Sequence, residues 1–265
     1  MGSYVTEAIV IGVRRYGEAD RLVTLFTRDR GRLTCIAKSA RKPTSRLRGI
    51  SEPFVRSKME LAEGKTLDIL RQAEVIDAHL GLRGSWSRLQ LAGHVAEIAT
   101  KLSDEKVPDE VLFELLGEVL DSISNDRRNA VIRFKARLLE HMGVYPDLSC
   151  CVRCGSEKVK GDVHLDSSYH GFICAECAKE TGTWRPVPMS VLYLLHELQN
   201  GNDPGEQDTD KFEMVDDILT NLLQQFIQAG FKTASAARHA RKAGLCDNKK
   251  ASEDETKTGP DAEPI

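Results

Sequence analysis

Four cysteines in two closely spaced pairs are the residues of this sequence best suited to bind a metal ion. Cys151 and Cys154 are separated by two residues, nineteen residues follow, and Cys174 and Cys177 repeat the same spacing. Two intervening residues allow one tight turn to aim both thiolates at a single ion, and a second pair completes a tetrahedron. Four thiolates leave no position open for water. The sequence therefore predicts one structural zinc ion and no catalysis by the metal.

Other metal ligands and other cysteine chemistry remain open at this point. Cys150 is a rival to Cys151, but three residues would then separate it from Cys154. His164 and His170 lie between the pairs without the characteristic spacing. A redox pair fits less well because no βαβ pattern surrounds either motif. The N-terminus has no basic leader, so we expect a cytoplasmic protein with reduced thiols.

A second group of residues, the cations of the segment AKSARKPTSRLRG, suits the binding of a polyanion. This segment contains no acidic residue, and its five cations are Lys38, Arg41, Lys42, Arg46 and Arg48. Residues 1–50 hold eleven Lys and Arg against four acids, although the whole chain has a formal net charge of -3. A basic N-terminal part on an acidic remainder predicts contact with phosphate backbones.

The elements that carry these cations read as strands. Apolar and β-branched residues with partial alternation predict five strands within the first eighty residues, at 6–15, 21–29, 32–38, 54–62 and 66–76. No helical pattern separates them, which predicts a small antiparallel barrel. The basic segment joins the third strand to the fourth, and barrel loops are where such folds bind ligands.

The elements that flank the cysteine segment are predicted to be helices. From Ser85 onward the apolar spacing changes to that of helices, with Leu91, Val95, Ile98 and Leu102 on one face. Further helices are predicted to begin at Pro108, near residue 128, after Pro188 and near residue 211, so the cysteine segment is an insertion in a helical bundle. Residues 247–265 have almost no apolar content and are predicted to be a disordered tail.

The segment YGEADRLVTLFTRDRGRLTCIAKSARKPTSRLRGISEPF, followed by CVRCG and CAEC, resembles RecO, a family of bacterial recombination mediators. The resemblance covers roughly residues 4–230. It implies an α+β multidomain protein, in which residues 1–80 form a five-stranded OB-fold barrel that binds nucleic acid. Residues 81–246 would form an α-helical bundle with an inserted four-cysteine zinc finger at 150–178, ahead of the 247–265 tail.

The resemblance also implies a function in DNA repair. The family binds single- and double-stranded DNA, anneals complementary strands, and works with RecR and single-stranded-DNA-binding protein to load the RecA recombinase. Carried over to this chain, the five cations of the basic segment become DNA contacts and the two CxxC pairs become zinc ligands. Arg14, Arg15 and Arg32 are weaker candidates for DNA contact. We expect a protein associated with the nucleoid and not with a membrane.

Two other functions compete with this interpretation. A zinc-containing, sequence-specific transcriptional regulator would need a basic recognition helix, and only the short stretch AARHARKAG after Phe231 is dense in cations. A zinc hydrolase would need an open metal position, which four thiolates do not leave. The sequence also lacks a Walker motif and any Ser/His/Asp or paired-carboxylate arrangement, so we expect a binding protein and not an enzyme.

Overall fold

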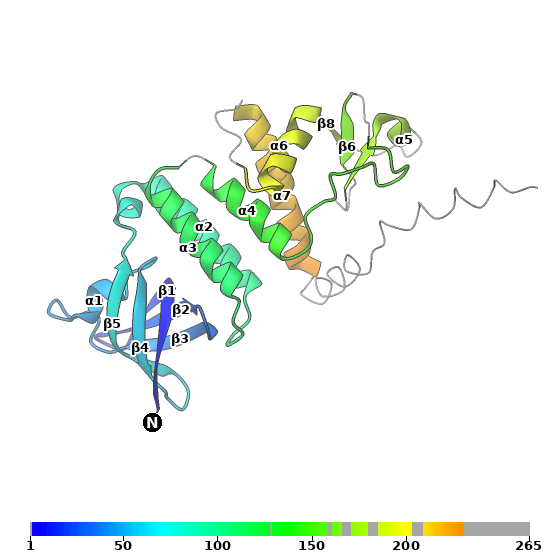
Figure 1. The fold of residues 1–265 in the computed structure, drawn as a ribbon. Coiled ribbons are helices and arrows are strands. Elements are labelled where there is room, and N and C mark those ends of the chain that lie inside the picture. The colour runs from blue at the N-terminus through cyan, green and yellow to red at the C-terminus, as the bar shows by residue number, and fades with distance from the viewer. Residues whose placement is uncertain are drawn as a thin grey trace, which may run out of the picture.

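The computed structural model describes residues 2–127, 129–157, 161–165, 171–179, 185–202 and 209–229. Along these residues the chain forms a barrel, then three long helices, a small sheet around the cysteines, and two further helices (Figure 1). The predicted tail at 247–265, the basic stretch after Phe231 and His170 lie outside the described residues. None of the described helices is long and apolar enough to cross a membrane.

The N-terminal part is a closed five-stranded barrel, as predicted. Its strands are β1 (Ser3–Tyr16), β2 (Asp20–Thr27), β3 (Gly31–Ala37), β4 (Arg56–Ala62) and β5 (Asp68–Asp77). They are hydrogen-bonded in the order β1-β2-β3-β5-β4, and β4 closes the ring against β1. The barrel is antiparallel, as predicted, except at one pair, because β3 and β5 run parallel. Directions cannot alternate all the way around a ring with an odd number of strands.

The barrel has its own apolar core. Strand β1 pairs with β4 through its first half and with β2 through its second half, and a bulge between Val10 and Gly12 marks the change. Alternating residues of the strands point inward, and those at the centre, such as Leu25, Met59 and Leu61, are fully buried. This packing fixes the ends of the strands, and with them the positions of the connecting loops.

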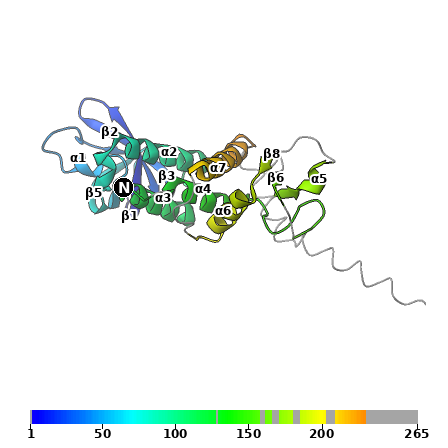
Figure 2. The same ribbon diagram turned by 90° about the horizontal axis from the view of Figure 1, so that it is seen from above.

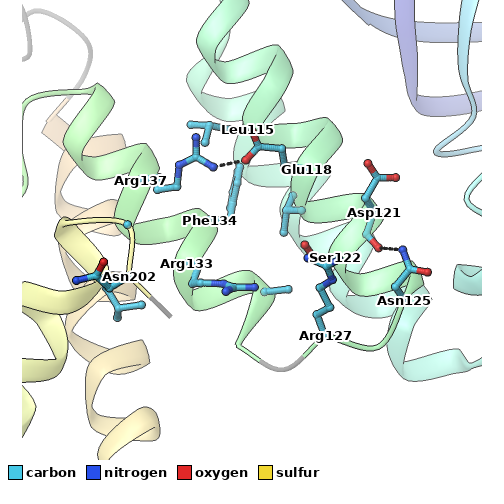
Figure 3. A pocket seen from close by; sticks show the side chains of 14 residues that line it. Leu115, Glu118, Asp121, Ser122, Asn125, Arg127, Arg133, Phe134, Arg137 and Asn202 are labelled. Atoms are coloured by element: carbon cyan, nitrogen blue, oxygen red, sulfur yellow. Dashed lines mark hydrogen bonds and ion pairs between the residues drawn. The ribbon is translucent and has the colours of Figure 1, made fainter. Parts of the chain in front are cut away.

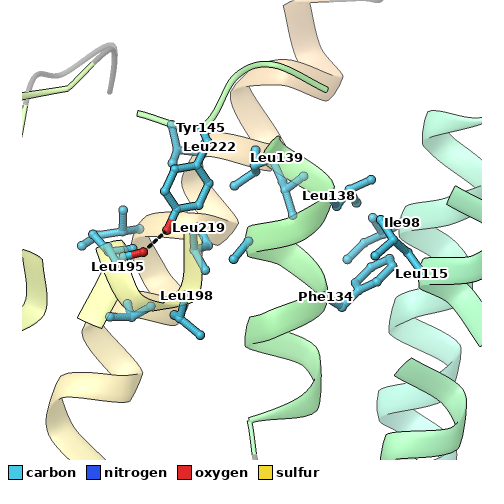
Figure 4. Close-up of a cluster of buried hydrophobic side chains, with 14 of the residues drawn as sticks. Ile98, Leu115, Phe134, Leu138, Leu139, Tyr145, Leu195, Leu198, Leu219 and Leu222 are labelled. Carbon is cyan, nitrogen blue, oxygen red and sulfur yellow. Dashed lines mark hydrogen bonds between the residues drawn. The ribbon is translucent and has the colours of Figure 1, made fainter. Parts of the chain in front are cut away.

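The helical part confirms the predicted bundle. Its helices are α2 (Trp86–Leu102), α3 (Glu110–Ser124), α4 (Ala130–His141), α6 (Met189–Gln199) and α7 (Thr209–Ala229). Figure 4 shows how Leu138 and Phe134 of α4 lie between Ile98 of α2 and Leu195 of α6. Tyr145, which follows α4, donates a hydrogen bond from its hydroxyl to the Leu195 carbonyl at 2.7 Å.

The helical spacing that groups Leu91 with Val95 and Ile98 predicts a core position for it. That prediction was wrong, because Leu91 is 43% exposed. The buried face of α2 includes the alanines at 92, 96 and 99. These small residues let the neighbouring elements approach closely and rotate the buried face away from Leu91. When alanines form the contacts of a helix, the spacing of its large apolar residues predicts the wrong buried face.

Helices α2 and α3 lie beside the barrel (Figure 2). Buried apolar side chains of both parts belong to one cluster. Phe26 of β2 packs on Phe113 of α3, with ring centroids 6.2 Å apart. At the start of β3, Gly31 has a φ of +66°, and a Cβ there would lie 2.2 Å from the Val107 carbonyl oxygen. Only glycine permits this close approach of the two parts.

The cysteine segment, predicted only as a loop, contains further secondary structure. Its elements are β6 (Val163–Leu165), β7 (Phe172–Cys174), the short helix α5 (Ala175–Lys179) and β8 (Arg185–Val187). The strands form a sheet in the order β7-β6-β8. Val163, Phe172 and Val187 are buried in the same apolar cluster as the helices, so this sheet packs against the bundle. Strands of three residues are too short to show alternation in the sequence.

Candidate nucleic-acid interface and metal centre

The predicted DNA-contacting cations lie in the connection between β3 and β4, where the short helix α1 (Leu47–Ile50) begins. We call residues 38–48 the basic loop. The Arg41 amide donates to the Ala19 carbonyl at 2.8 Å, and the Ser39 amide donates to Asp20 Oδ1 at 2.6 Å. Since residues 17–19 join β1 to β2, the basic loop lies at the barrel end where β1 stops.

Two arginines hold the basic loop in place. Arg41 is half-buried and donates from Nη1 to the Glu18 carbonyl at 2.8 Å. Arg21 of β2 reaches the other end of the loop, donating to the Arg48 carbonyl at 3.1 Å and pairing with Glu52 at 2.9 Å. Arg41 therefore supports the loop through its Nη1 group. Sequence reasoning treated Arg41 like its neighbours and did not single out Arg21.

The other four cations of the basic loop are turned to solvent. Lys38, Lys42, Arg46 and Arg48 are exposed, and none forms an ion pair with a described residue. Arg14 and Arg15, the weaker candidates near the end of β1, are also exposed. The strand registers place them at the same end of the barrel, because Arg15 lies opposite Arg21, and Arg21 lies opposite Ala37 at the end of β3.

Cations on the side of the barrel that faces the helices are paired with carboxylates. Arg28 interacts with Glu7 at 3.1 Å, with Glu110 at 2.9 Å and with Glu114. Arg56 binds Glu7 at 2.6 Å and Glu114 at 3.5 Å. Both guanidinium groups also lie over the ring of a phenylalanine of α3, at 5.2 and 5.3 Å from its centroid. These arginines join the barrel to α3. Because the neighbouring carboxylates neutralise their charge, they are poorly suited to bind a polyanion.

Arg32 belongs to the same neutralised group. Its guanidinium lies 3.6 Å from Glu105 and donates to the Ser103 carbonyl at 3.3 Å. This weaker candidate for DNA contact is thus directed toward the connection between α2 and α3. The acidic remainder of the chain neutralises the cations that face it and leaves those of the basic loop unpaired.

The structure brings the four predicted metal ligands together. Ligand atoms of Cys151, Cys154, Cys174 and Cys177 all lie within 4.8 Å of one another. Cys174 ends β7 and Cys177 lies in α5, so the second pair spans a strand-to-helix turn. The first pair forms a tight turn closed by the Gly155 amide, which donates to the Cys151 carbonyl at 2.8 Å. Gly155 has a φ of +71°, which favours glycine.

The surroundings of these sulfurs suit a cation. Burial alone would raise the pKa of the Cys151 thiol, but the backbone N–H groups of Cys154, Cys174 and Arg153 point at its sulfur and lower the pKa to about 6. At Cys177 the pKa is raised, first by the side-chain hydrogen bond with Cys174 and then by burial. Four thiols this close do not all ionise without a positive charge among them, and a divalent metal supplies that charge.

Two family models match this chain, and together they cover most of it. The model described as "Recombination protein O N terminal" matches residues 1–79, and "Recombination protein O C terminal" matches residues 83–233. The chain belongs to the RecO family. The junction between the two RecO matches falls after His79, where the barrel ends and the helical part begins.

Individual RecO proteins show the same relationship. The chain is 36% identical over 199 residues to the DNA repair protein RecO of Desulforudis audaxviator, covering 75% of this chain and 80% of that protein. It is 42% identical over 206 residues to the RecO protein of Heliobacterium modesticaldum, covering 75% of each chain. The RecO protein of Bacillus subtilis is 34% identical over 191 residues, covering 71% of this chain and 74% of the relative.

The helical part of this RecO-family chain also has a cavity that sequence reasoning missed. Its volume is about 390 Å³, and it opens between α3, α4 and the residues after α6 (Figure 3). Arg127, Arg133 and Arg137 line it, and Arg137 pairs with Glu118 of α3. The spacing of Arg133 and Arg137 places both on one face of α4, which is the only local signal of the cavity.

Proposed function

We propose that this protein binds single- and double-stranded DNA without sequence specificity, anneals complementary strands and, with RecR, helps load the RecA recombinase onto DNA coated by single-stranded-DNA-binding protein. Membership of the RecO family supports a role in recombinational repair. The observation that carries the DNA-binding part is the contrast within the barrel. Lys38, Lys42, Arg46 and Arg48 have no acidic partner among the described residues, whereas the arginines facing the helices are neutralised.

Phosphate contacts explain why the binding is insensitive to sequence. A cation that approaches a phosphate releases condensed counterions, and this gain does not depend on the base. Sequence is read by contacts to base edges, which require side chains positioned in a groove. The basic loop presents lysines and arginines without aromatic residues among them, so it suits the backbone and not the bases.

Annealing follows from the same charges and needs no bond to be made or broken. Two DNA strands repel each other because both are polyanions. A cationic surface lowers that repulsion and keeps both strands close until base pairing nucleates. Exposed Arg14 and Arg15 extend the cationic surface at this end of the barrel. We therefore propose a binding protein and not an enzyme.

We further propose that Cys151, Cys154, Cys174 and Cys177 hold one structural zinc ion. The donor set fits, because four thiolates in reach of one another are the ligands of structural zinc sites. A bound zinc ion neutralises the thiolates and ties the Cys151–Cys154 turn to β7 and α5. It takes no part in DNA chemistry.

The proposed domain organisation follows these two sites. Residues 1–80 are the OB-fold that binds nucleic acid, and residues 81–246 are the helical bundle with the zinc finger at 150–178. Residues 247–265 are proposed to be a disordered tail, and they lie outside the described residues. We place the protein in the cytoplasm, associated with the nucleoid.

Strand annealing in the presence of single-stranded-DNA-binding protein tests the proposal. Complementary strands are mixed bare or coated, with and without RecR, and pairing is followed by fluorescence. We expect the protein to accelerate annealing in both states. The loop variant, which carries Lys42→Ala, Arg46→Ala and Arg48→Ala, is expected to anneal more slowly. Annealing of coated strands at the uncatalysed rate would refute the mediator function.

A sequence-specific regulator is separated from this function by a filter-binding comparison. Random single strands and random duplexes are compared at two salt concentrations. We expect similar affinities that fall steeply with salt. A strong preference for one duplex sequence would favour the zinc-containing transcriptional regulator instead.

A further inference from the structure

His79 occupies an unusual position where the barrel joins the helical part. It follows β5 and precedes the short helix η1 (Leu80–Gly84), and its side chain is only 1% exposed. Its backbone has a φ of +43° and a ψ of +48°, the left-handed conformation that non-glycine residues rarely adopt. The His79 amide donates to Asp77 Oδ1 at 2.6 Å, which stabilises this turn.

The hydrogen bonds of His79 determine which ring nitrogen is free. Nδ1 lies 2.7 Å from the Phe54 carbonyl oxygen. A carbonyl only accepts, so Nδ1 carries the hydrogen. In a neutral imidazole Nε2 then presents a lone pair. That atom is buried and has no hydrogen-bond partner among the residues that the structure describes.

One carboxylate faces this lone pair, and a second lies close by. Asp121 of α3 places Oδ1 at 3.0 Å from Nε2, without the geometry of a hydrogen bond. The ligand atoms of Asp77, His79 and Asp121 all lie within 4.8 Å of one another. A nitrogen lone pair and a carboxylate repel each other at this distance unless a positive charge lies with them. Neighbouring ligands of one zinc-sized ion are separated by about 3.0–3.4 Å, since each bond is about 2.1 Å long.

We propose that Asp77, His79 and Asp121 bind a divalent transition-metal ion, at a second site separate from the four cysteines. One imidazole and two carboxylates suit an ion of intermediate hardness such as Zn²⁺ or Mn²⁺. Figure 3 shows the Asp121 carboxylate directed away from the arginines of the cavity. Asp77 is exposed and the Asp121 side chain is 50% exposed, so water completes the coordination shell.

The position of the site indicates what the ion does. Asp77 ends β5 of the barrel, and Asp121 lies in α3 of the helical part. A metal bound to both ties the two parts together at the junction of the chain. It thereby fixes the orientation of the basic loop relative to the helices. The competing arrangement is a protonated imidazole that donates to Asp121, and it requires no metal.

Binding of Mn²⁺ to the zinc-loaded protein tests the site. Mn²⁺ is the probe because it prefers oxygen and imidazole and competes poorly for thiolates. The six-line electron paramagnetic resonance signal of free Mn²⁺ reports the bound fraction. We expect one Mn²⁺ bound per chain, affinity at least about 10-fold weaker in Asp121→Asn and in His79→Asn, and no change in Asp104→Asn. Asp104 is exposed, and it is outside the cluster.

A thermal melt provides a second readout. Mn²⁺ is expected to raise the Tm of the wild-type protein and of Asp104→Asn, but not that of Asp121→Asn. Should His79→Asn not fold, Asp121→Asn and the exposed Asp77→Asn decide the question. The proposal is overturned if the wild-type protein leaves the free Mn²⁺ signal unchanged, or if the aspartate variants bind Mn²⁺ as the wild-type protein does.

Discussion

Removing three unpaired cations of the basic loop is the most direct test of the charge argument. The loop variant replaces Lys42, Arg46 and Arg48 with alanine and leaves Arg41 in place, because Arg41 holds the loop against the β1–β2 turn. All three replaced side chains are exposed. Their removal is therefore expected to change the charge of the surface without unfolding the barrel.

The magnitude follows from the number of phosphates that the variant can no longer neutralise. Each phosphate bound on a single strand contributes about 0.7 to the slope of log K against log salt, so three of them make the slope shallower by about 2. If binding at about 1 M salt is unaffected, affinity at about 0.15 M salt falls by roughly 50-fold. That factor corresponds to about 2 kcal/mol of binding free energy.

The assay is fluorescence anisotropy of a labelled single strand of mixed sequence, titrated at several salt concentrations. A control variant with Lys58→Ala, Lys65→Ala and Arg71→Ala loses the same charge from exposed positions on β4, β5 and their connection. We expect the control to retain the wild-type slope. An unchanged slope in the loop variant would show that the basic loop does not contact the phosphates. A control that loses as much affinity as the loop variant would show that net charge, and not the basic loop, governs binding.

Three further predictions concern the helical part and the barrel core. Cys174→Ser is expected to lose the zinc ion and to lower the Tm, and full metal content by elemental analysis would show that the ligand set is wrong. Burial raises the pKa of Cys35 to about 12, so its thiol stays neutral at pH 8 and is expected to resist iodoacetamide in the folded protein; rapid labelling in mass spectra would contradict this. Lys135, 4% exposed, pairs with Asp216 at 2.7 Å, so Asp216→Ala is expected to cost about 3–5 kcal/mol in urea denaturation. Lys135→Met removes the buried charge itself and is expected to cost less than Asp216→Ala, and the reverse order would refute this reasoning.

Short-range patterns predicted much of the fold. The alternation of apolar residues located all five barrel strands, and the helical spacing located α2, α3, α4, α6 and α7. These patterns are visible because each element must bury one face. The three-residue strands around the cysteines were not predicted, since so few residues carry no period.

Other features of the fold depend on how the elements meet. The parallel pairing of β3 with β5 follows from closing a ring of five strands, and no residue of either strand encodes it locally. Likewise, Leu91 has the spacing of a core residue but is exposed, because alanines form the close contacts of α2.

The candidate sites divide in the same way. The spacing of the cysteines was enough to predict their cluster, because two CxxC turns that come together place four thiolates around one ion. The charge of the basic loop was also evident from the sequence. The sequence did not show which cations remain unpaired, because the carboxylates that neutralise Arg28 lie as many as 86 residues away in the chain.

By itself, the sequence determined the strand and helix types, the thiolate cluster and a surplus of positive charge near the N-terminus, because each depends on residues close together in the chain. Tertiary structure decided which arginines join the barrel to α3 and which face solvent. It also placed Asp121 against the buried ring of His79. Ion pairs and ligand sets between distant residues depend on packing, and packing is a property of the whole chain.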